Sequence, residues 1–267
     1  MVVRIGMVQK ISLKSKSKLW YSGDGMNDTQ NKKIVVITGA SRGLGRAIAK
    51  KLASPESILV LCSRDIKKLK KVYLELKNEE VECYAYRVDV SKKKSVIKFF
   101  RMVLKKLGKI DILINNAGAI HKKKLMEKIT DKEFELCMKT NFESVFYTLR
   151  EIIPAMKKRK SGTIISISST TAKRGNPDFA AYSASKFAVT GLMQSAARSL
   201  DDYGIRCLTI FPSGIRTDMR KYILGADEAS TQQSPDSVAE HIKNTIENVV
   251  EFPNGSEIVI RDGQIMR

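Results

Sequence analysis

The chain has 267 residues, of which 48 are Lys or Arg and 28 are Asp or Glu, so its net charge is +20. This length suits one large domain with a substantial core. Four scattered cysteines without C-x-x-C spacing and only two histidines argue against a disulfide framework, and we expect no metal site. No apolar run reaches the roughly 18 residues of a membrane span, and we expect a cytoplasmic protein.

The excess of positive charge could favour nucleic acid, a membrane surface or an acidic protein as a partner. The lysines, however, lie in short runs along nearly every predicted helix, without interleaved aromatic residues or a known nucleic-acid motif. This distribution favours a lysine-rich, solvated surface over a dedicated polyanion site. We therefore do not expect nucleic acid to be a partner.

Residues 1–31 are predicted to be a basic N-terminal extension outside the domain, which spans residues 32–267. The extension has no helix or strand periodicity beyond a short apolar start, and several lysines precede its first acid, Asp24. Three explanations compete: a disordered arm, a targeting peptide, or a start site assigned too early, with Met26 as the initiator. We favour the last.

From Lys32 onward, short runs rich in Val and Ile alternate with helical patterns, which predicts βαβ units and a parallel sheet. We place seven strands near 34–38, 58–62, 83–88, 110–115, 162–168, 206–211 and 257–261. The helices are expected near 44–53, 65–77, 92–107, 131–158, 182–203 and 235–249. Right-handed crossovers then give a single-domain α/β Rossmann-type doubly wound sheet, with helices on both faces and a ligand crevice at the carboxyl ends of the strands.

A glycine-rich turn, T-G-A-S-R-G-L-G, follows the first predicted strand and opens the first helix. Glycine allows a tight turn and a close backbone approach, while the N-terminus of the helix offers free N–H groups to a pyrophosphate. A turn that only packs a strand against a helix is the alternative. If the turn binds a dinucleotide, the contacting residues are Gly39, Ser41, Arg42, Gly43, Leu44 and Gly45.

The residues after the second strand predict NADP(H) as the cofactor. A dinucleotide fold uses an acid at this point to bind the ribose of NAD, or an arginine to bind the 2′-phosphate of NADP. Here Ser63 stands where the acid is expected, Arg64 follows it, and Arg42 can reach the same phosphate. Asp65 is the counterargument, but an acid that opens a helix is more simply an N-cap.

Tyr182 and Lys186 lie four residues apart in Y-S-A-S-K, inside a predicted helix. This spacing puts both side chains on one face, one turn apart. A cation beside a phenol favours the phenolate, so the pair can exchange a proton with a carbonyl or an alcohol near neutral pH. By itself the pattern is weak evidence, because any helix can carry it by chance.

Further motifs end the fourth and fifth strands: N-N-A-G and I-S-I-S-S-T. Together with the glycine-rich turn and Y-S-A-S-K, this order resembles the short-chain dehydrogenase/reductase family, from about Lys32 to the C-terminus. The resemblance implies a general acid/base role for Tyr182, and a lysine, Lys186, that lowers its pKa and binds the nicotinamide ribose. It implies that Ser169, thirteen residues before the tyrosine, polarises the substrate carbonyl.

The resemblance also implies that Asn141, in K-T-N-F, holds a water of a proton relay behind the lysine; a polar core residue is the alternative. The other positions that match the family's cofactor site are Asp89, Val90, Asn116, Ala117, Gly118, Ile215 and Thr217.

One position departs from the family, which usually has Pro-Gly after the sixth strand. Here Ser213 stands in place of that glycine, and we expect cofactor binding to persist with an altered turn. The segment 220–234 should cover the substrate, but its sequence does not indicate which substrate the pocket accepts.

We therefore expect an NADP(H)-dependent oxidoreductase that transfers a hydride between the nicotinamide and a carbonyl or secondary alcohol. The first alternative is a 3-oxoacyl-acyl-carrier-protein reductase, since a basic surface would suit an acidic carrier protein. A minor alternative is a non-catalytic NADP-sensing or nucleic-acid-binding protein on the same fold. The family commonly assembles through its two long helices, and the matching segments here are apolar on more than one face. We expect a homotetramer or homodimer.

Overall fold

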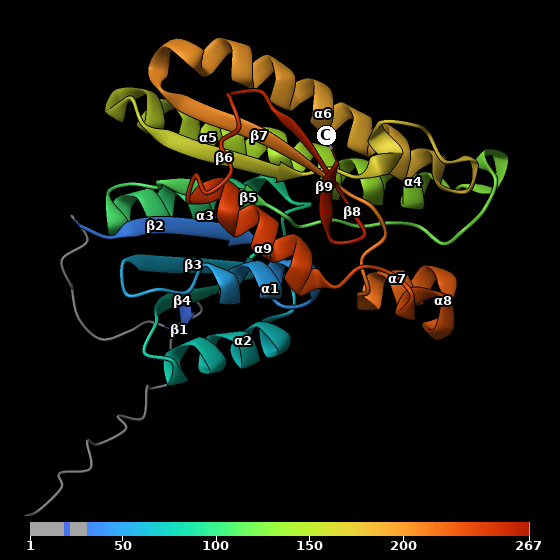
Figure 1. The fold of residues 1–267 in the computed structure, drawn as a ribbon, viewed down its shortest axis with the longest axis horizontal. Helices are drawn as coiled ribbons and strands as arrows, with labels where there is room; N and C mark the ends of the chain where they lie inside the picture. The colour runs from blue at the N-terminus through green and yellow to red at the C-terminus, as the bar shows by residue number, and fades with distance from the viewer. Residues whose placement is uncertain (1–18, 22–30, 267) are drawn as a thin grey trace, which may run out of the picture.

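In the computed structural model, which describes residues 19–21 and 31–266, the apolar runs of the sequence become parallel strands of one sheet (Figure 1). All seven predicted strands are present, with ends that differ by at most two residues. They are β2 (Lys33–Thr38), β3 (Ser57–Ser63), β4 (Glu82–Arg87), β5 (Ile112–Asn115), β6 (Gly162–Ile167), β7 (Ile205–Pro212) and β8 (Glu257–Arg261). Every residue of β3 is buried, as expected for a parallel strand that is covered on both faces.

Two further strands, which the sequence did not predict, extend the sheet at its edges. β1 (Leu19–Tyr21) pairs antiparallel with β4, and β9 (Gln264–Met266) pairs antiparallel with β8. Over the described residues the sheet has nine strands, in the order β1-β4-β3-β2-β5-β6-β7-β8-β9. β1 falls within the predicted N-terminal extension, whose other residues, 1–18 and 22–30, lie outside the described part of the chain. The division at residue 31 stays a prediction.

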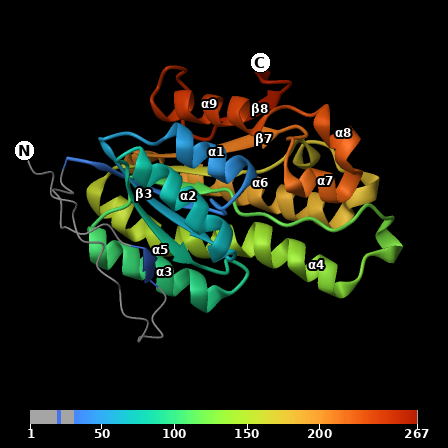
Figure 2. The same cartoon turned by 90° about the horizontal axis from the view of Figure 1, so that it is seen from below.

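Helices cover both faces of the sheet, and the predicted doubly wound α/β fold is confirmed (Figure 2). One face packs against α1 (Gly43–Lys51), α2 (Ile66–Asn78) and α9 (Pro235–Ile246), and the other against α3 (Lys93–Leu107), α5 (Ser144–Arg159) and α6 (Ala180–Leu200). Each layer has its own apolar core, with Ile48 and Ile242 in the first and Phe100 and Met193 in the second. Burial of these side chains on both faces fixes the sheet between the helix layers.

The strand order reverses at β2, which lies between β3 and β5. From β2 the chain builds outward to β3 and β4 on one side, then returns to β5 and continues through β6, β7 and β8 on the other. In such sheets the connections diverge at the reversal and leave a crevice at the carboxyl ends of the strands. The loops after β2, β3, β4, β5, β6 and β7 meet around this crevice.

The predicted helix over 131–158 is interrupted. It consists of α4 (Asp131–Cys137), one wide π turn (Met138–Glu143) and α5. Two short helices, α7 (Asp218–Leu224) and α8 (Ala226–Ser230), follow β7 in a region where no helix was predicted. Among the helices of the described residues, none has the length and apolar character needed to cross a membrane.

Candidate active site

A cavity of about 650 Å³ lies at the carboxyl ends of the central strands. Nearly all of the predicted site residues line it, although they come from seven separate segments of the chain. They are Gly39, Ser41, Arg42, Gly43, Leu44, Gly45, Arg64, Asp89, Val90, Asn116, Ala117, Gly118, Ser169, Tyr182, Lys186, Ile215 and Thr217. The predicted residue that does not line the cavity is Asn141, which lies behind it. A volume of this size is in the range of cofactor sites.

The glycine-rich turn needs its glycines for two separate reasons. Gly39 and Gly43 have φ angles of +69° and +52°, in the left-handed region that favours glycine. A Cβ on Gly39 would lie 2.8 Å from the Cα of Ala117, and a Cβ on Gly45 would overlap the carbonyl oxygen of Gly39. The turn is thus pressed against the N-N-A-G loop, where the Asn116 side-chain amide donates to the Thr38 carbonyl oxygen at 2.9 Å.

The same turn leaves the first N–H groups of α1 without a side-chain cap, because the N-cap residue is Arg42 and its side chain makes no capping hydrogen bond. Uncapped N–H groups at a helix N-terminus, together with the helix dipole, form an anion-binding site. Packing and anion binding are therefore compatible functions of one turn, and the donor set fits the pyrophosphate of a dinucleotide.

The region after β3 carries the features expected of an NADP site. The Ser63 hydroxyl donates to Ser41 Oγ at 2.8 Å, which joins this strand end to the glycine-rich turn. Asp65 accepts a hydrogen bond from the Lys68 backbone N–H at 3.0 Å, so its predicted role as the N-cap of α2 is confirmed. Arg64 is exposed at the cavity and has no ion pair with any described residue. Arg42 lies 3.7 Å from the Asp218 carboxylate.

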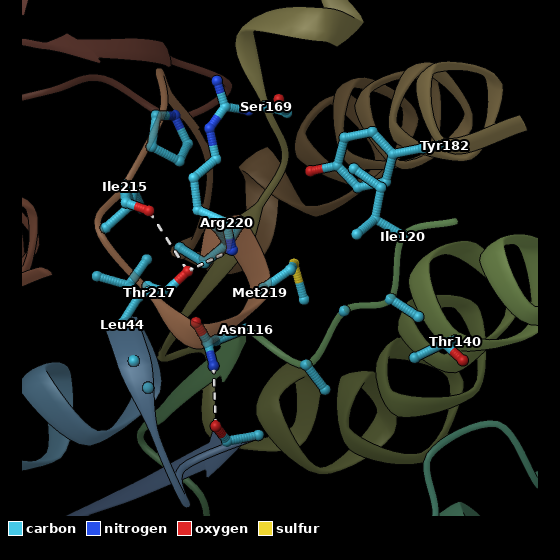
Figure 3. Close-up of a pocket in the computed structure, with 18 of the residues that line it drawn as sticks. Leu44, Asn116, Ile120, Thr140, Ser169, Tyr182, Ile215, Thr217, Met219 and Arg220 are labelled. Atoms are coloured by element: carbon cyan, nitrogen blue, oxygen red, sulfur yellow. Dashed lines mark hydrogen bonds between the residues drawn. The ribbon is translucent and has the colours of Figure 1, made fainter. Parts of the chain in front are cut away.

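Ser169, Tyr182 and Lys186 gather at the other end of the cavity, and Figure 3 shows the Tyr182 hydroxyl pointing into the cavity. Ser169 Oγ accepts a hydrogen bond from the Thr171 N–H at 3.2 Å, and the Ser169 hydroxyl lies within hydrogen-bonding reach of Tyr182. Ser168, by contrast, donates to the Lys186 carbonyl oxygen at 3.1 Å in the interior. Both serines line the cavity but differ in their hydrogen bonds, and the choice of Ser169 stays a prediction.

Burial dominates the proton affinities of the two central groups. Lys186 is 4 % exposed, and burial lowers its pKa to about 8. Its ammonium group donates to the Ile167 carbonyl oxygen at 2.7 Å and lies 5.8 Å from the centre of the Tyr182 ring. The sequence suggests a lowered pKa for Tyr182, but burial raises it here, while the Ser169 hydroxyl and the Arg220 charge act in the opposite direction.

Asn141 occupies the π turn between α4 and α5 and is 1 % exposed. Its Oδ1 accepts a hydrogen bond from the Ala119 N–H at 2.7 Å, and its Nδ2 donates to the Ala119 carbonyl oxygen and to Ser185 Oγ. The side chain therefore connects the loop after β5 to α6. A Cβ on Gly118 would lie 3.4 Å from Asn141 Oδ1 and 3.8 Å from Lys186 Nζ, so these two polar groups border the same small space. π turns are frequent at functional sites.

The residues that the resemblance pointed to lie together at one cavity. Comparison with known proteins identifies the family. The family model described as short chain dehydrogenase matches residues 33–228. The chain belongs to the short-chain dehydrogenase family. It is therefore an oxidoreductase, as the motifs predicted.

Two of the curated relatives are named as reductases of different substrates. The chain is 32% identical to the NADPH-dependent pterin aldehyde reductase of Arabidopsis thaliana, over 85% of this chain and 93% of the relative. It is 36% identical to a 3-oxoacyl-acyl-carrier-protein reductase of Staphylococcus epidermidis, over 70% of this chain and 77% of the relative. A crystal structure of an actinorhodin polyketide ketoreductase with NADPH superposes with a TM-score of 0.81 at 25% identity, covering 88% of this chain and 97% of the ketoreductase.

The one departure from the short-chain dehydrogenase pattern has a structural explanation. The Ser213 hydroxyl accepts a hydrogen bond from the Gln233 side-chain amide at 2.9 Å, which anchors the end of β7 to the chain before α9. Gly214 stands one residue later, and the end of the Gln232 side chain packs over it. Ile215 and Thr217 line the cavity beyond this turn.

Several residues of the site were not predicted from the sequence. Those labelled in Figure 3 are Ile120, Thr140, Met219 and Arg220. A signal for Arg220 did exist: Thr217 is the N-cap of α7, and T-D-M-R places the arginine in the first turn of a helix that starts at the cavity. The sequence segment after Thr217 looked featureless because its helices are too short to show a period.

Proposed function

We propose that the protein is an NADP(H)-dependent oxidoreductase that transfers a hydride between the nicotinamide and a carbonyl or secondary alcohol, with Tyr182 as general acid/base. The observation that carries the proposal is the division of one cavity into two ends. One end has an uncapped helix N-terminus with Arg42 and Arg64, and the other has Ser169, Tyr182 and Lys186. The bound cofactor supplies or accepts the hydride.

The proposed cofactor contacts follow from this division. The N-terminus of α1 and the glycine-rich turn bind the pyrophosphate, and Arg42 and Arg64 bind the 2′-phosphate of NADP(H). Asp89 and Val90 hold the adenine, Asn116 to Gly118 line the ribose side, and Ile215 and Thr217 contact the nicotinamide carboxamide. The NADPH named for the Arabidopsis thaliana relative and for the ketoreductase structure supports this choice of cofactor.

The proposed chemistry uses the groups that the other contacts leave free. Ser169 donates its hydroxyl proton to the substrate oxygen, which orients the carbonyl and stabilises the charge that develops on it. Tyr182 donates a proton to the same oxygen when the carbonyl carbon accepts the hydride, and removes it in the reverse direction. Lys186 keeps two N–H donors beyond its bond to Ile167, for the nicotinamide ribose and for a water held near Asn141.

The test is NADPH oxidation by the purified protein with a panel of ketones, aldehydes and acetoacetyl thioesters. Tyr182→Phe should lower kcat by about 10²- to 10⁴-fold, the usual contribution of a general acid. Tyr203→Phe is the matched control, because Tyr203 lies in a short helix after α6 and does not line the cavity. Equal activity of the wild type and Tyr182→Phe would contradict the assignment.

A 3-oxoacyl-acyl-carrier-protein reductase is the second candidate, supported by the Staphylococcus epidermidis relative and by the net charge of +20. An acidic carrier protein would associate faster with a basic surface at low ionic strength. The comparison is between an acetoacetyl group on acyl carrier protein and the same group on a small thiol. A preference for the carrier-bound substrate that declines with added salt would support this candidate, and equal rates would exclude it.

Two further proposals concern partners. Large apolar side chains are exposed on α4, α5 and α6 (Phe134, Phe146 and Phe187), which supports a homo-oligomer formed through the segments 131–158 and 182–203. A monomer in light scattering would contradict that assembly.

Binding of RNA that persists at moderate ionic strength would favour the nucleic-acid alternative, because non-specific binding falls steeply with salt.

A further inference from the structure

Arg220 is an arginine that points into the cavity from the first turn of α7. Its backbone N–H donates to the Thr217 hydroxyl at 3.3 Å, which fixes the start of the helix. Figure 3 shows its side chain running from α7 toward Ser169, on the side of the cavity that the Tyr182 hydroxyl faces. Its positive charge is near enough to Tyr182 to act on the pKa of the phenol. Arg220 therefore belongs to the substrate end of the cavity.

The guanidinium group lacks a counter-charge. Its Nε is buried and has no hydrogen-bond partner, and no described carboxylate forms an ion pair with it. The acids that line the cavity are engaged elsewhere: Asp65 caps α2, Asp89 accepts from Ser91, and Asp218 pairs with Arg42 and Lys68. A partly buried cation without a partner is unfavourable unless a ligand supplies the opposite charge.

The surrounding chain restricts where the guanidinium can lie. A Cβ on Gly214 would be 3.3 Å from Arg220 Nη2 and would overlap the Gln232 side chain, so both side chains pack over this glycine. The planar group is thus held between the turn after β7 and the cavity. A guanidinium fixed in this way matches the two oxygens of a carboxylate.

We propose that Arg220 is a specificity-determining residue that binds the carboxylate of an oxo-acid substrate, or of the corresponding hydroxy acid, whose reacting carbon lies at Ser169 and Tyr182. The proposal rests on the proposed oxidoreductase function and names its substrate class. In the reduction, the carbonyl carbon accepts a hydride from NADPH and the oxygen accepts a proton from Tyr182, which is replenished from solvent. Oxo acid, NADPH and a proton give hydroxy acid and NADP⁺, and the carboxylate is unchanged.

The experiment compares acids with their neutral methyl esters: pyruvate, acetoacetate and levulinate, each against its ester. The proteins are the wild type, Arg220→Gln, Arg220→Lys and Arg216→Gln. Arg216 is an exposed arginine of the same segment that does not line the cavity, so it controls for loss of a nearby charge. The readouts are kcat and KM for each substrate, and the NADPH dissociation constant for each protein.

For at least one pair, the wild type should have a higher kcat/KM for the acid than for the ester. Arg220→Gln should lower kcat/KM for that acid by about 10²-fold, mainly through KM, because a charge-assisted hydrogen bond is lost. Ester reduction and NADPH affinity should stay within about threefold, as should all values for Arg216→Gln. Arg220→Lys should recover part of the loss, since it keeps the charge without the fork geometry. Competitive inhibition of ester reduction by succinate in the wild type tests the carboxylate site without any variant.

A wild type that reduces esters or neutral aldehydes but prefers none of the acids overturns the inference and leaves the oxidoreductase function in place. The inference is also overturned if Arg220→Gln lowers kcat/KM for the acid and for the ester by the same factor, which would make Arg220 a structural residue. A loss of NADPH affinity as large as the loss of acid reduction would make it a cofactor-binding residue and would overturn the inference as well. If no carbonyl compound is reduced, charged or neutral, the proposed function itself is wrong and the inference falls with it.

Discussion

Replacement of Lys186 by methionine should change how the stability of the protein depends on pH. Burial lowers the pKa of Lys186 from 10.5 to about 8, so the folded state binds fewer protons than the unfolded state between these values. Stability therefore rises with pH across this window, and at lower pH the folded protein bears the cost of a buried charge. At about 1.4 kcal/mol for each unit of pKa difference, this cost is about 3 kcal/mol at neutral pH.

At about pH 9.5 the buried lysine is mostly neutral and about 1 kcal/mol of the cost remains. Lys186→Met has no charge to bury. The difference in free energy of unfolding, variant minus wild type, should thus fall by about 2 kcal/mol between about pH 7 and pH 9.5. Methionine also leaves the Ile167 carbonyl oxygen without its donor, a loss of about 1 to 3 kcal/mol. That loss does not depend on pH, so the change with pH isolates the charge.

The assay is urea unfolding followed by circular dichroism at both pH values, without added cofactor. Lys98→Met, on the exposed side of α3, is the matched control and should show the same pH dependence as the wild type. The buried thiols and tyrosines titrate in all three proteins and cancel in the differences, except Cys137, which interacts electrostatically with Lys186 and contributes to the change. Parallel curves for Lys186→Met and the wild type would refute a buried, proton-poor lysine in the folded state.

Three other substitutions, one with a control at Gly191, test separate parts of the site. Gly45→Ala should destabilise the protein by about 3 kcal/mol or more in urea unfolding, because its Cβ would overlap the Gly39 carbonyl oxygen. Gly191→Ala, on α6 with open space around it, should instead stabilise by up to about 1 kcal/mol, and similar effects at the two glycines would contradict the packing argument. Asn141→Ala should cost about 2 to 4 kcal/mol in the same assay by leaving buried partners unpaired, and a loss of activity without loss of stability would favour a relay role alone. Arg64→Gln should weaken NADPH binding about tenfold while NADH binding stays constant, as measured by cofactor fluorescence titration; equal effects would place the 2′-phosphate elsewhere.

Much of this fold could be predicted because a parallel sheet that is covered on both faces leaves a strong pattern in the sequence. The runs that became β2, β3 and β5 are largely apolar along their length. Motifs that directly follow parallel strands lie together at one edge of the sheet, and this does not depend on the conformation of each loop. β1 and β9 were missed since three residues are too few to show a period of two.

The remaining differences depend on contacts between residues that are distant in the sequence. The sequence around K-T-N-F shows no break in the predicted helix. The π turn found there accompanies hydrogen bonds of Asn141 to Ala119 and Ser185, which are distant in the sequence. The raised pKa of Tyr182 reflects burial by segments that only the fold brings together. For the same reason, the orientation of Arg220 could not be predicted from the polar segment that contains it.

The first turn of α7 touches both ends of the cavity. Thr217 packs on Gly43 and Asp218 lies near Arg42, while Arg220, two residues further on, faces Ser169. An insertion or deletion in this turn would disturb the cofactor end and the substrate end together. Engineering of the substrate range would therefore succeed more readily by side-chain exchange at Arg220 or Ile223, with the length of the turn unchanged.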